Sequence, residues 1–274
     1  MPATETAAFR AASRPTSSEE RAFFEQNGYL VVKQLLNAEQ LDELRRRTDE
    51  ALAGSAPQFG DFEIQWEPGM ESRTDLPREK RLRVMFNLTH RDPFFWSHAT
   101  RPEIVDTVEN LIGPDVIYYT DQLFVKGAYN GTAVPWHQDS AYWPVDPPAL
   151  LSCWMALDDA TVENGCVRVL PGSHKKAIAH RHFKQGPQTL GLLDEDLDPA
   201  NEVAVEIQAG GAMFHHSLLV HRSEPNRSAK GRRGLVSIYL PNYCRFTRPW
   251  DFKYGFKLLR GGTKPGCIGH KGEN

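Results

Sequence analysis

Two kinds of hydrophobic pattern divide the chain, with helical patterns before residue 113 and strand patterns after it. Ser17 with Glu20, and Asn37 with Gln40, fit the capping box that opens an amphipathic helix. The run YLVVKQ between these two helices predicts a strand. The segment DPFFWSHATRPEIVDTVENLIG predicts two further helices, the second ending at Gly113.

Short runs rich in β-branched and aromatic residues follow from residue 114 onward. Turn residues separate six of them: VIYYTDQLFVKG, LLSCWMALDD, CVRVLPGS, VAVEIQAG, GAMFHHSLLVHRS and RRGLVSIYLP. Helices first and many short strands afterwards are typical of an antiparallel sandwich or jelly roll with helices packed outside. We expect a flexible tail at residues 1–16 and a single, mostly β domain at 17–274, with its core near 114–242.

Composition and charge exclude several classes of protein. The 274 residues are 40% hydrophobic and 24% charged, which is ordinary for a chain that buries a core. The net charge is −3 without a basic stripe, so nucleic acid is not an expected partner. The longest apolar runs are far shorter than the ~20 residues that span a bilayer, and the N-terminus lacks the features of a signal peptide. The four cysteines have no CxxC spacing, which favours reduced thiols in a cytoplasmic protein without membrane association.

Two His-x-Asp pairs are candidates for a metal site. Non-haem iron(II) oxygenases need two histidines and one carboxylate on one face of the metal. His137 and Asp139 follow a strand–turn–strand pattern, and residues two apart on a strand point the same way. His90 and Asp92 precede Pro93 and a helical pattern, where Asp92 fits a helix N-cap. We therefore expect the first pair to bind the metal.

A downstream segment supplies a third ligand candidate and a cation. His221 follows an apolar run, and Arg232 begins another strand pattern eleven residues later. We expect two antiparallel strands joined by a loop, which would place His221 and Arg232 side by side. A guanidinium can hold a carboxylate with two parallel hydrogen bonds, and Ser223 can add a hydroxyl donor.

The pattern His-x-Asp, then His-x-Ser-x-x-Asn, then Arg resembles the phytanoyl-CoA dioxygenase (PhyH) family of iron(II)- and 2-oxoglutarate-dependent oxygenases, which includes ectoine hydroxylases. It is carried here by His137, Asp139, His221, Ser223, Asn226 and Arg232. The stretches FFEQNGYLVVKQLL and VENGCVRVLPGSHK are also similar to the family, whereas residues 54–80 are the least similar part. The resemblance implies a cupin-like double-stranded β-helix with the metal between its two sheets.

The resemblance also assigns roles to the candidate residues. Iron(II) would be bound by His137, Asp139 and His221. The C5 carboxylate of 2-oxoglutarate would be held by Arg232 and Ser223. The cosubstrate pocket would be lined by Gln122, Trp154 and Arg83, the last with a small gap in the spacing. Trp154 as a core residue and Gln122 as a partner of strand-edge backbone are the alternatives.

Other polar and aromatic residues near these motifs have two interpretations each. Tyr142 and Trp143 either line the substrate pocket or plug the mouth of the barrel. His215 and His216 are adjacent on a strand and must point opposite ways, so we expect one to face the interior without binding the metal. The two histidines of the segment AHRHF have no suitably spaced cysteine or carboxylate, which favours the surface over a zinc site.

The implied activity is oxidation of an unactivated C–H bond of a small molecule, with 2-oxoglutarate and O2 consumed and succinate and CO2 released. Asp139 favours hydroxylation or another oxidation, because related halogenases carry a small residue there. The alternatives are a cupin-like hydrolase or isomerase without 2-oxoglutarate, and a non-catalytic metal-binding member. No polybasic patch fits the phosphates of CoA, so we expect a small metabolite as the substrate. The loops at 54–80 and 179–200 would select it. We also expect a monomer or homodimer.

Overall fold

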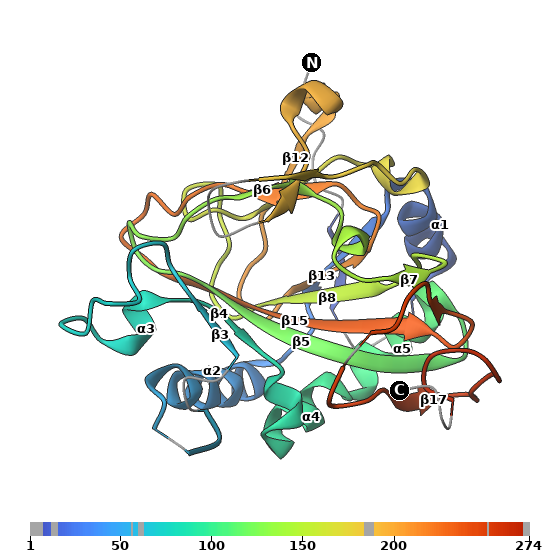
Figure 1. The fold of residues 1–274 in the computed structure, drawn as a ribbon, viewed down its shortest axis with the longest axis horizontal. Helices are drawn as coiled ribbons and strands as arrows, with labels where there is room; N and C mark the ends of the chain where they lie inside the picture. Colours follow the sequence, from blue (N-terminus) through green and yellow to red (C-terminus); the bar gives the residue numbers. More distant parts are fainter. Residues whose placement is uncertain are drawn as a thin grey trace.

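Two antiparallel β-sheets face each other, and helices cover the outer face of the larger sheet (Figure 1). The computed structural model describes residues 8–11, 16–55, 57–59, 63–183, 189–250 and 252–270. This arrangement is the mostly β jelly roll predicted from the sequence, and helices before residue 113 precede most of its strands.

The larger sheet has nine strands in the order β1-β2-β13-β8-β15-β5-β4-β3, with β17 also paired to β5. Their bounds are β1 (Ala8–Ala11), β2 (Tyr29–Gln34), β3 (Ile64–Trp66), β4 (Leu82–Phe86), β5 (Val116–Lys126), β8 (Leu151–Ala156), β13 (Ala212–His216), β15 (Arg232–Pro241) and β17 (Lys257–Arg260). Neighbours in this sheet are antiparallel apart from β1 and β2.

The smaller sheet lies above the larger one and has the order β12-β9-β14-β6. Its strands are β6 (Val134–His137), β9 (Val167–Val169), β12 (Val203–Val205) and β14 (His221–Ser223). Two short ribbons complete the described strands, and they pair β7 (Val145–Asp146) with β16 (Arg245–Phe246) and β10 (Arg181–His182) with β11 (Leu190–Gly191).

The helices begin and end close to the positions that the sequence predicts. The α-helices are α1 (Ser18–Asn27), α2 (Ala38–Ala53), α3 (Arg78–Arg81), α4 (Pro93–Ala99) and α5 (Pro102–Ile112). Both predicted capping boxes are present, at Ser17 with Glu20 and at Asn37 with Gln40. The short 3-10 helices are η1 (Pro57–Phe59), η2 (Leu88–His90), η3 (Asp139–Ala141), η4 (Ser173–Lys175), η5 (Asp194–Asp196) and η6 (Pro199–Asn201).

Side chains of the larger sheet alternate between two hydrophobic cores. Phe214 and Leu235 belong to the core shared with α2, α4 and α5. Met213 and Val236, each next in sequence to one of these, belong to the core between the two sheets. Because successive strand residues point to opposite faces, polar residues on the Met213 face are directed into the space between the sheets.

Two strand predictions were wrong in detail. His221 and Arg232 lie on consecutive strands, but β14 belongs to the smaller sheet and β15 to the larger one. The loop at 224–231 crosses from one sheet to the other, so the two residues come from opposite walls of the interior. Asp139 does not lie on a strand, because β6 ends at His137 and the chain turns into η3.

Three segments expected to lack regular structure contain short elements. Residues 54–80 include β3 and part of α3, and residues 179–200 include the β10–β11 ribbon. Residues 8–11 of the predicted tail pair with β2, while residues 1–7 and 12–15 lie outside the described residues.

Candidate active site

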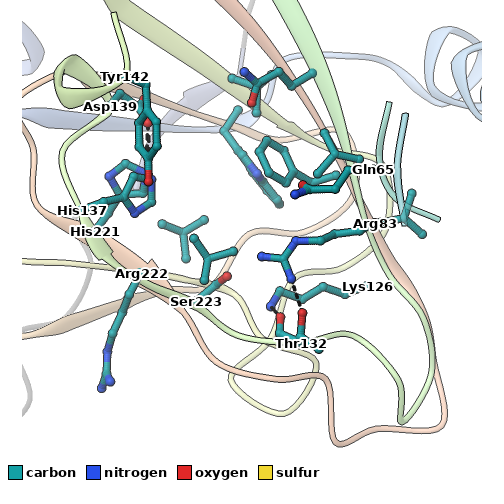
Figure 2. Close-up of a pocket in the computed structure, with 18 of the residues that line it drawn as sticks. Gln65, Arg83, Lys126, Thr132, His137, Asp139, Tyr142, His221, Arg222 and Ser223 are labelled. Carbon is teal, nitrogen blue, oxygen red and sulfur yellow. Dashed lines mark hydrogen bonds and ion pairs between the residues drawn. The ribbon is translucent and has the colours of Figure 1, made fainter. Parts of the chain in front are cut away.

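The ends of β6 and β14 bring two histidines together. His137 and His221 are register partners, and their ring centroids are 4.1 Å apart. Asp139 follows in η3, with its Oδ1 3.5 Å from His137 Nε2 and 3.6 Å from His221 Nε2. Figure 2 shows the three at one side of a cavity. They form the potential metal-binding group found among the described residues.

The backbone fixes the tautomer of both histidines. The Nδ1 atom of His137 lies 2.9 Å from Pro135 O, and that of His221 lies 2.9 Å from Leu219 O. A carbonyl oxygen only accepts, so each Nδ1 carries the hydrogen and each Nε2 presents a lone pair. Burial, together with neighbouring His137, lowers the pKa of His221 to about 3, which keeps this imidazole neutral.

Asp139 completes the group as an ionised carboxylate. Burial on its own would raise its pKa, but His221, His137 and His215 together hold the pKa well below its usual range. Its Oδ2 accepts hydrogen bonds from Ser152 Oγ at 3.0 Å and from His215 Nε2 at 3.1 Å. Two imidazole Nε2 atoms and one carboxylate turned to a common point are the donor set of the 2-His-1-carboxylate iron(II) sites, so these residues fit that metal.

The second His-x-Asp pair, His90 and Asp92, has a structural role. Asp92 is buried and caps α4 by accepting a hydrogen bond from Phe94 N at 2.8 Å. It also forms an ion pair with Arg47. The ring of His90 stacks on Tyr254, with centroids 4.6 Å apart. The prediction that Asp92 is a helix N-cap is confirmed.

A cavity of about 290 Å³ extends from the three candidate ligands into the space between the sheets (Figure 2). Each predicted cosubstrate or substrate residue has atoms in its wall: Gln122, Trp154, Arg83, Ser223, Arg232, Tyr142 and Trp143. The structure therefore places all seven residues in the wall of one cavity, five of them on strands of the two sheets and two in the segment after η3.

Arg232 is buried at the start of β15, against the ring of Trp154. Its guanidinium lies over the ring of Trp154, 5.0 Å from the centroid, and donates to Gly165 O. Its buried Nε has no hydrogen-bond partner among the described residues. Gly234 allows this packing, because a Cβ there would come within 2.3 Å of the Trp154 ring. Burial lowers the pKa of Arg232 to about 10, so it remains a cation at neutral pH.

Lys126 adds a buried amine that the sequence reasoning did not assign to the site. It lies four residues after Gln122 on β5. Residues an even number apart on a strand point to the same face, so both side chains point into the cavity. Its Nζ donates to Glu224 O at 2.8 Å and to Thr132 O. Burial, with the charges of Arg232 and Arg83, lowers the pKa of Lys126 to about 6. The two-residue alternation along β5 was the signal that could have found it.

Arg83 enters the cavity from β4, opposite the metal-ligand side (Figure 2). It donates to Thr132 Oγ1 and to Ala133 O, and its guanidinium is 3.8 Å from the buried carboxylate of Glu67. Glu67 in turn accepts from Thr132 Oγ1 at 2.8 Å. Two buried guanidinium cations, Arg83 and Arg232, and the Lys126 amine thus lie around the one buried carboxylate of Glu67, which leaves this end of the cavity positive and suited to an anionic group.

The remaining motif residues divide between the cavity and its supports. Ser223 is buried and shares the inward face of β14 with His221. Asn226 lies in the following loop, where its amide donates to Lys126 O at 3.1 Å and to Lys230 O at 2.8 Å. Asn226 therefore shapes the crossing from the smaller to the larger sheet.

Two aromatic residues after η3 form part of the cavity wall. Tyr142 donates its hydroxyl hydrogen to Leu190 O at 2.7 Å, and its ring meets the edge of His137 with centroids 5.9 Å apart. Trp143 packs edge-on against Tyr119, 5.7 Å between centroids. Tyr142 is therefore the nearer of the two to the candidate metal ligands.

The sequence reasoning missed the role of Gln138, which lies between two ligand candidates. Its backbone N–H donates to His180 Nε2 at 2.8 Å, and its side chain donates to Leu218 O at 2.6 Å and to Lys176 O at 2.8 Å. His180 was expected at the surface rather than in a zinc site; it is half-buried and accepts a hydrogen bond from the backbone of the His137–Asp139 turn. No spacing rule connects residues 42 positions apart, so the sequence carried no signal for this contact.

Comparison with known proteins decides the family. The model of the phytanoyl-CoA dioxygenase (PhyH) family matches residues 24–234. The chain belongs to this family. The relatives include a probable phytanoyl-CoA dioxygenase of Caenorhabditis elegans, 27% identical over 84% of this chain and 77% of the relative. The peroxisomal phytanoyl-CoA dioxygenase of Bos taurus is 26% identical over 84% of this chain and 70% of that protein. The protein is therefore an iron(II)- and 2-oxoglutarate-dependent dioxygenase, as the sequence predicted.

Solved structures show the same fold. The protein EctD from S. alaskensis, determined with 2-oxoglutarate and 5-hydroxyectoine, aligns with a TM-score of 0.71 at 22% identity over 96% of this chain and 86% of EctD. The 2-oxoglutarate-dependent carbocyclase SnoK aligns with a TM-score of 0.68 at 24% identity over 88% of this chain and 96% of SnoK. Among the described residues, no helix is both long and apolar enough to cross a membrane.

Proposed function

We propose that the protein oxidises an unactivated C–H bond of a small-molecule metabolite, using His137, Asp139 and His221 to bind iron(II). One observation carries the proposal: two histidines and a carboxylate lie at one part of a cavity that also holds the buried guanidinium of Arg232, whose Nε has no hydrogen-bond partner among the described residues. A cupin-like hydrolase or isomerase has no evident use for that arginine.

We assign Arg232 and Ser223 to the C5 carboxylate of 2-oxoglutarate. The chemistry supplied by the bound metal and cosubstrate is the oxidation itself, with release of succinate and CO2. The chain contributes orientation and exclusion of water. The Arg232 guanidinium lies over the Trp154 ring, which limits its motion, and Gln122 lines the same cavity. A water-poor setting strengthens the interaction between the guanidinium and a carboxylate.

The cavity supports a small substrate. Its volume of about 290 Å³ lies at the low end of the ~300–1,000 Å³ that is usual for ligand pockets, and 2-oxoglutarate has to share it. Tyr142 and Trp143 are the proposed substrate contacts beside the metal. A cytoplasmic location and a monomeric or homodimeric state stay predictions.

Succinate formation tests the assignment of the cosubstrate. The purified protein with iron(II), O2 and 2-oxoglutarate should form succinate, and a panel of metabolites should be screened for those that accelerate it. Arg232→Ala should weaken 2-oxoglutarate binding by about 2–5 kcal/mol, roughly 30-fold or more, because a buried charge pair is lost. Metal binding should be unchanged.

Arg233→Ala is the matched control for this test. Arg233 is the next residue on β15, but it points to the other face and pairs with Asp158 at 2.8 Å. Its loss should lower stability without changing the affinity for 2-oxoglutarate. Unchanged 2-oxoglutarate affinity in Arg232→Ala, or oxygen-independent turnover without succinate, would contradict the proposal.

A further inference from the structure

His215 reaches the candidate metal centre from the opposite sheet. It lies on β13 of the larger sheet, whereas His137 and His221 lie on β6 and β14 of the smaller one. Its side chain is 3% exposed, and its ring centroid is 4.9 Å from that of His221. Its Nε2 is directed to Asp139 Oδ2, 3.1 Å away, and it is not part of the potential metal-binding group. His215 therefore connects the larger sheet to the candidate metal centre, as Ser152 of β8 also does.

The two oxygens of Asp139 have different surroundings. Oδ1 faces the Nε2 atoms of His137 and His221, at 3.5 and 3.6 Å. Oδ2 is occupied by two hydrogen-bond donors, the Ser152 hydroxyl and His215. An oxygen that already accepts two hydrogen bonds from fixed donors is a poor additional metal ligand. The carboxylate is thus arranged to offer one oxygen only.

The protonation of His215 follows from its partner. A carboxylate oxygen only accepts, so His215 Nε2 carries the hydrogen and donates it. Its Nδ1 is buried and has no hydrogen-bond partner within the described part of the chain. A buried polar atom without a partner is costly in free energy, so phenylalanine would be the more stable choice if this position served packing alone. Histidine adds the Nε2 donor that is directed to Asp139.

We propose that His215 is a positioning residue of the metal centre, which holds the outer oxygen of Asp139 so that the carboxylate binds the ion through one oxygen. The inference rests on the proposed function, because it takes His137, Asp139 and His221 as the ligands. Outer-shell hydrogen bonds of this kind orient metal-binding carboxylates and tune their affinity. A carboxylate bound through both oxygens would take a coordination position that 2-oxoglutarate and O2 require.

Three substitutions separate this role from general packing. His215→Phe removes the donor and keeps the ring, and His215→Gln keeps an N–H donor on a flexible side chain. His216→Phe is the matched control, because His216 is the next residue on β13 and its ring is turned away to His174, 5.6 Å between centroids. Melting temperatures of the metal-free variants would establish that each one folds.

The test measures Co(II) and Mn(II) binding by each purified variant, with the Co(II) absorption spectrum as the readout of coordination number. His215→Phe should bind both ions about 10–100-fold more weakly, the usual loss for an outer-shell partner. Its Co(II) spectrum should change in intensity, and His215→Gln should recover most of the affinity. His216→Phe should match the wild type in affinity and spectrum.

Three results would overturn the inference. Wild-type affinity and spectrum in His215→Phe would remove any role at the metal. Equal weakening in His216→Phe would make the effect one of strand stability. Loss as complete as in His221→Ala would make His215 a ligand. A wild-type protein that binds neither ion would instead refute the proposed function itself, so the two failures are distinguishable.

Discussion

The fold uses two His-x-Asp pairs of identical spacing for different purposes. His137 and Asp139 lie between the two sheets, where their Nε2 and Oδ1 atoms face a third candidate ligand, His221. His90 stacks on an aromatic ring, and Asp92 caps α4 from outside the larger sheet. The comparison teaches that spacing alone does not make a metal site. A His-x-Asp pair can bind a metal only when its nitrogen and oxygen lone pairs are not used in other contacts and are directed to a common point.

The largest expected effect comes from removing the carboxylate of each pair in turn. Asp139→Ala should lose metal affinity by more than the 10–100-fold typical of outer-shell changes, because a direct ligand is lost. Its succinate formation should fall below detection. Asp92→Ala should bind the metal and form succinate at wild-type levels when folded. Isothermal titration with Mn(II) and a succinate assay measure both quantities.

The second expected effect is on stability, and here Asp92 is the carboxylate whose removal matters. Asp92→Ala removes the cap of α4 and the ion pair with Arg47, so the free energy of unfolding should fall by about 1–3 kcal/mol. Urea denaturation of the metal-free proteins measures this change. Mn(II) should raise the melting temperature of Asp92→Ala as it does that of the wild type, because the ion binds only the folded state. Mn(II) should not raise the melting temperature of Asp139→Ala. If it raised the melting temperature of Asp139→Ala and not that of Asp92→Ala, the second pair would be the metal-binding one.

The effect expected to be smallest at neutral pH is a pH dependence at His90. Burial lowers the pKa of His90 to about 4 in the folded protein, below its ordinary value of 6.5. Between these two values the unfolded chain binds the proton that the folded one does not, so stability is lost as the pH falls from 6.5 towards 4. The contribution is at most about 1.4 kcal/mol per pH unit. His90→Phe keeps the stack on Tyr254 and should flatten this part of the stability profile, and an unchanged slope would contradict the assignment.

Local rules predicted the parts of the fold that depend on local interactions. The capping boxes at Ser17 and Asn37, the cap at Asp92 and the strand runs after residue 114 all involve contacts within a few residues. The jelly roll followed from the order of these elements and from the family resemblance. The sheet to which each strand belongs could not be predicted in this way. A loop such as 224–231 can return the chain to the same sheet or carry it to the other one.

The site residues that belong to a short motif could be predicted, whereas contacts between segments distant in sequence could not. His137, Asp139 and His221 could be named because their types and spacing are restricted by metal chemistry. The hydrogen bonds of Lys126 with Glu224 and of His180 with Gln138 were missed because they join segments remote in sequence, although alternation along β5 could have placed Lys126 in the cavity. Such contacts depend on how the two sheets close on each other.

Anaerobic titration of 2-oxoglutarate into the iron(II)-loaded protein tests the central claim most directly. Chelation of iron(II) by a 2-oxo acid produces a visible charge-transfer absorption, which reports metal and cosubstrate together. We predict a saturable band in the wild type and in Asp92→Ala, and none in Asp139→Ala. A band of wild-type intensity and affinity in Asp139→Ala, or its loss in folded Asp92→Ala, would contradict the assignment of the first pair to the metal.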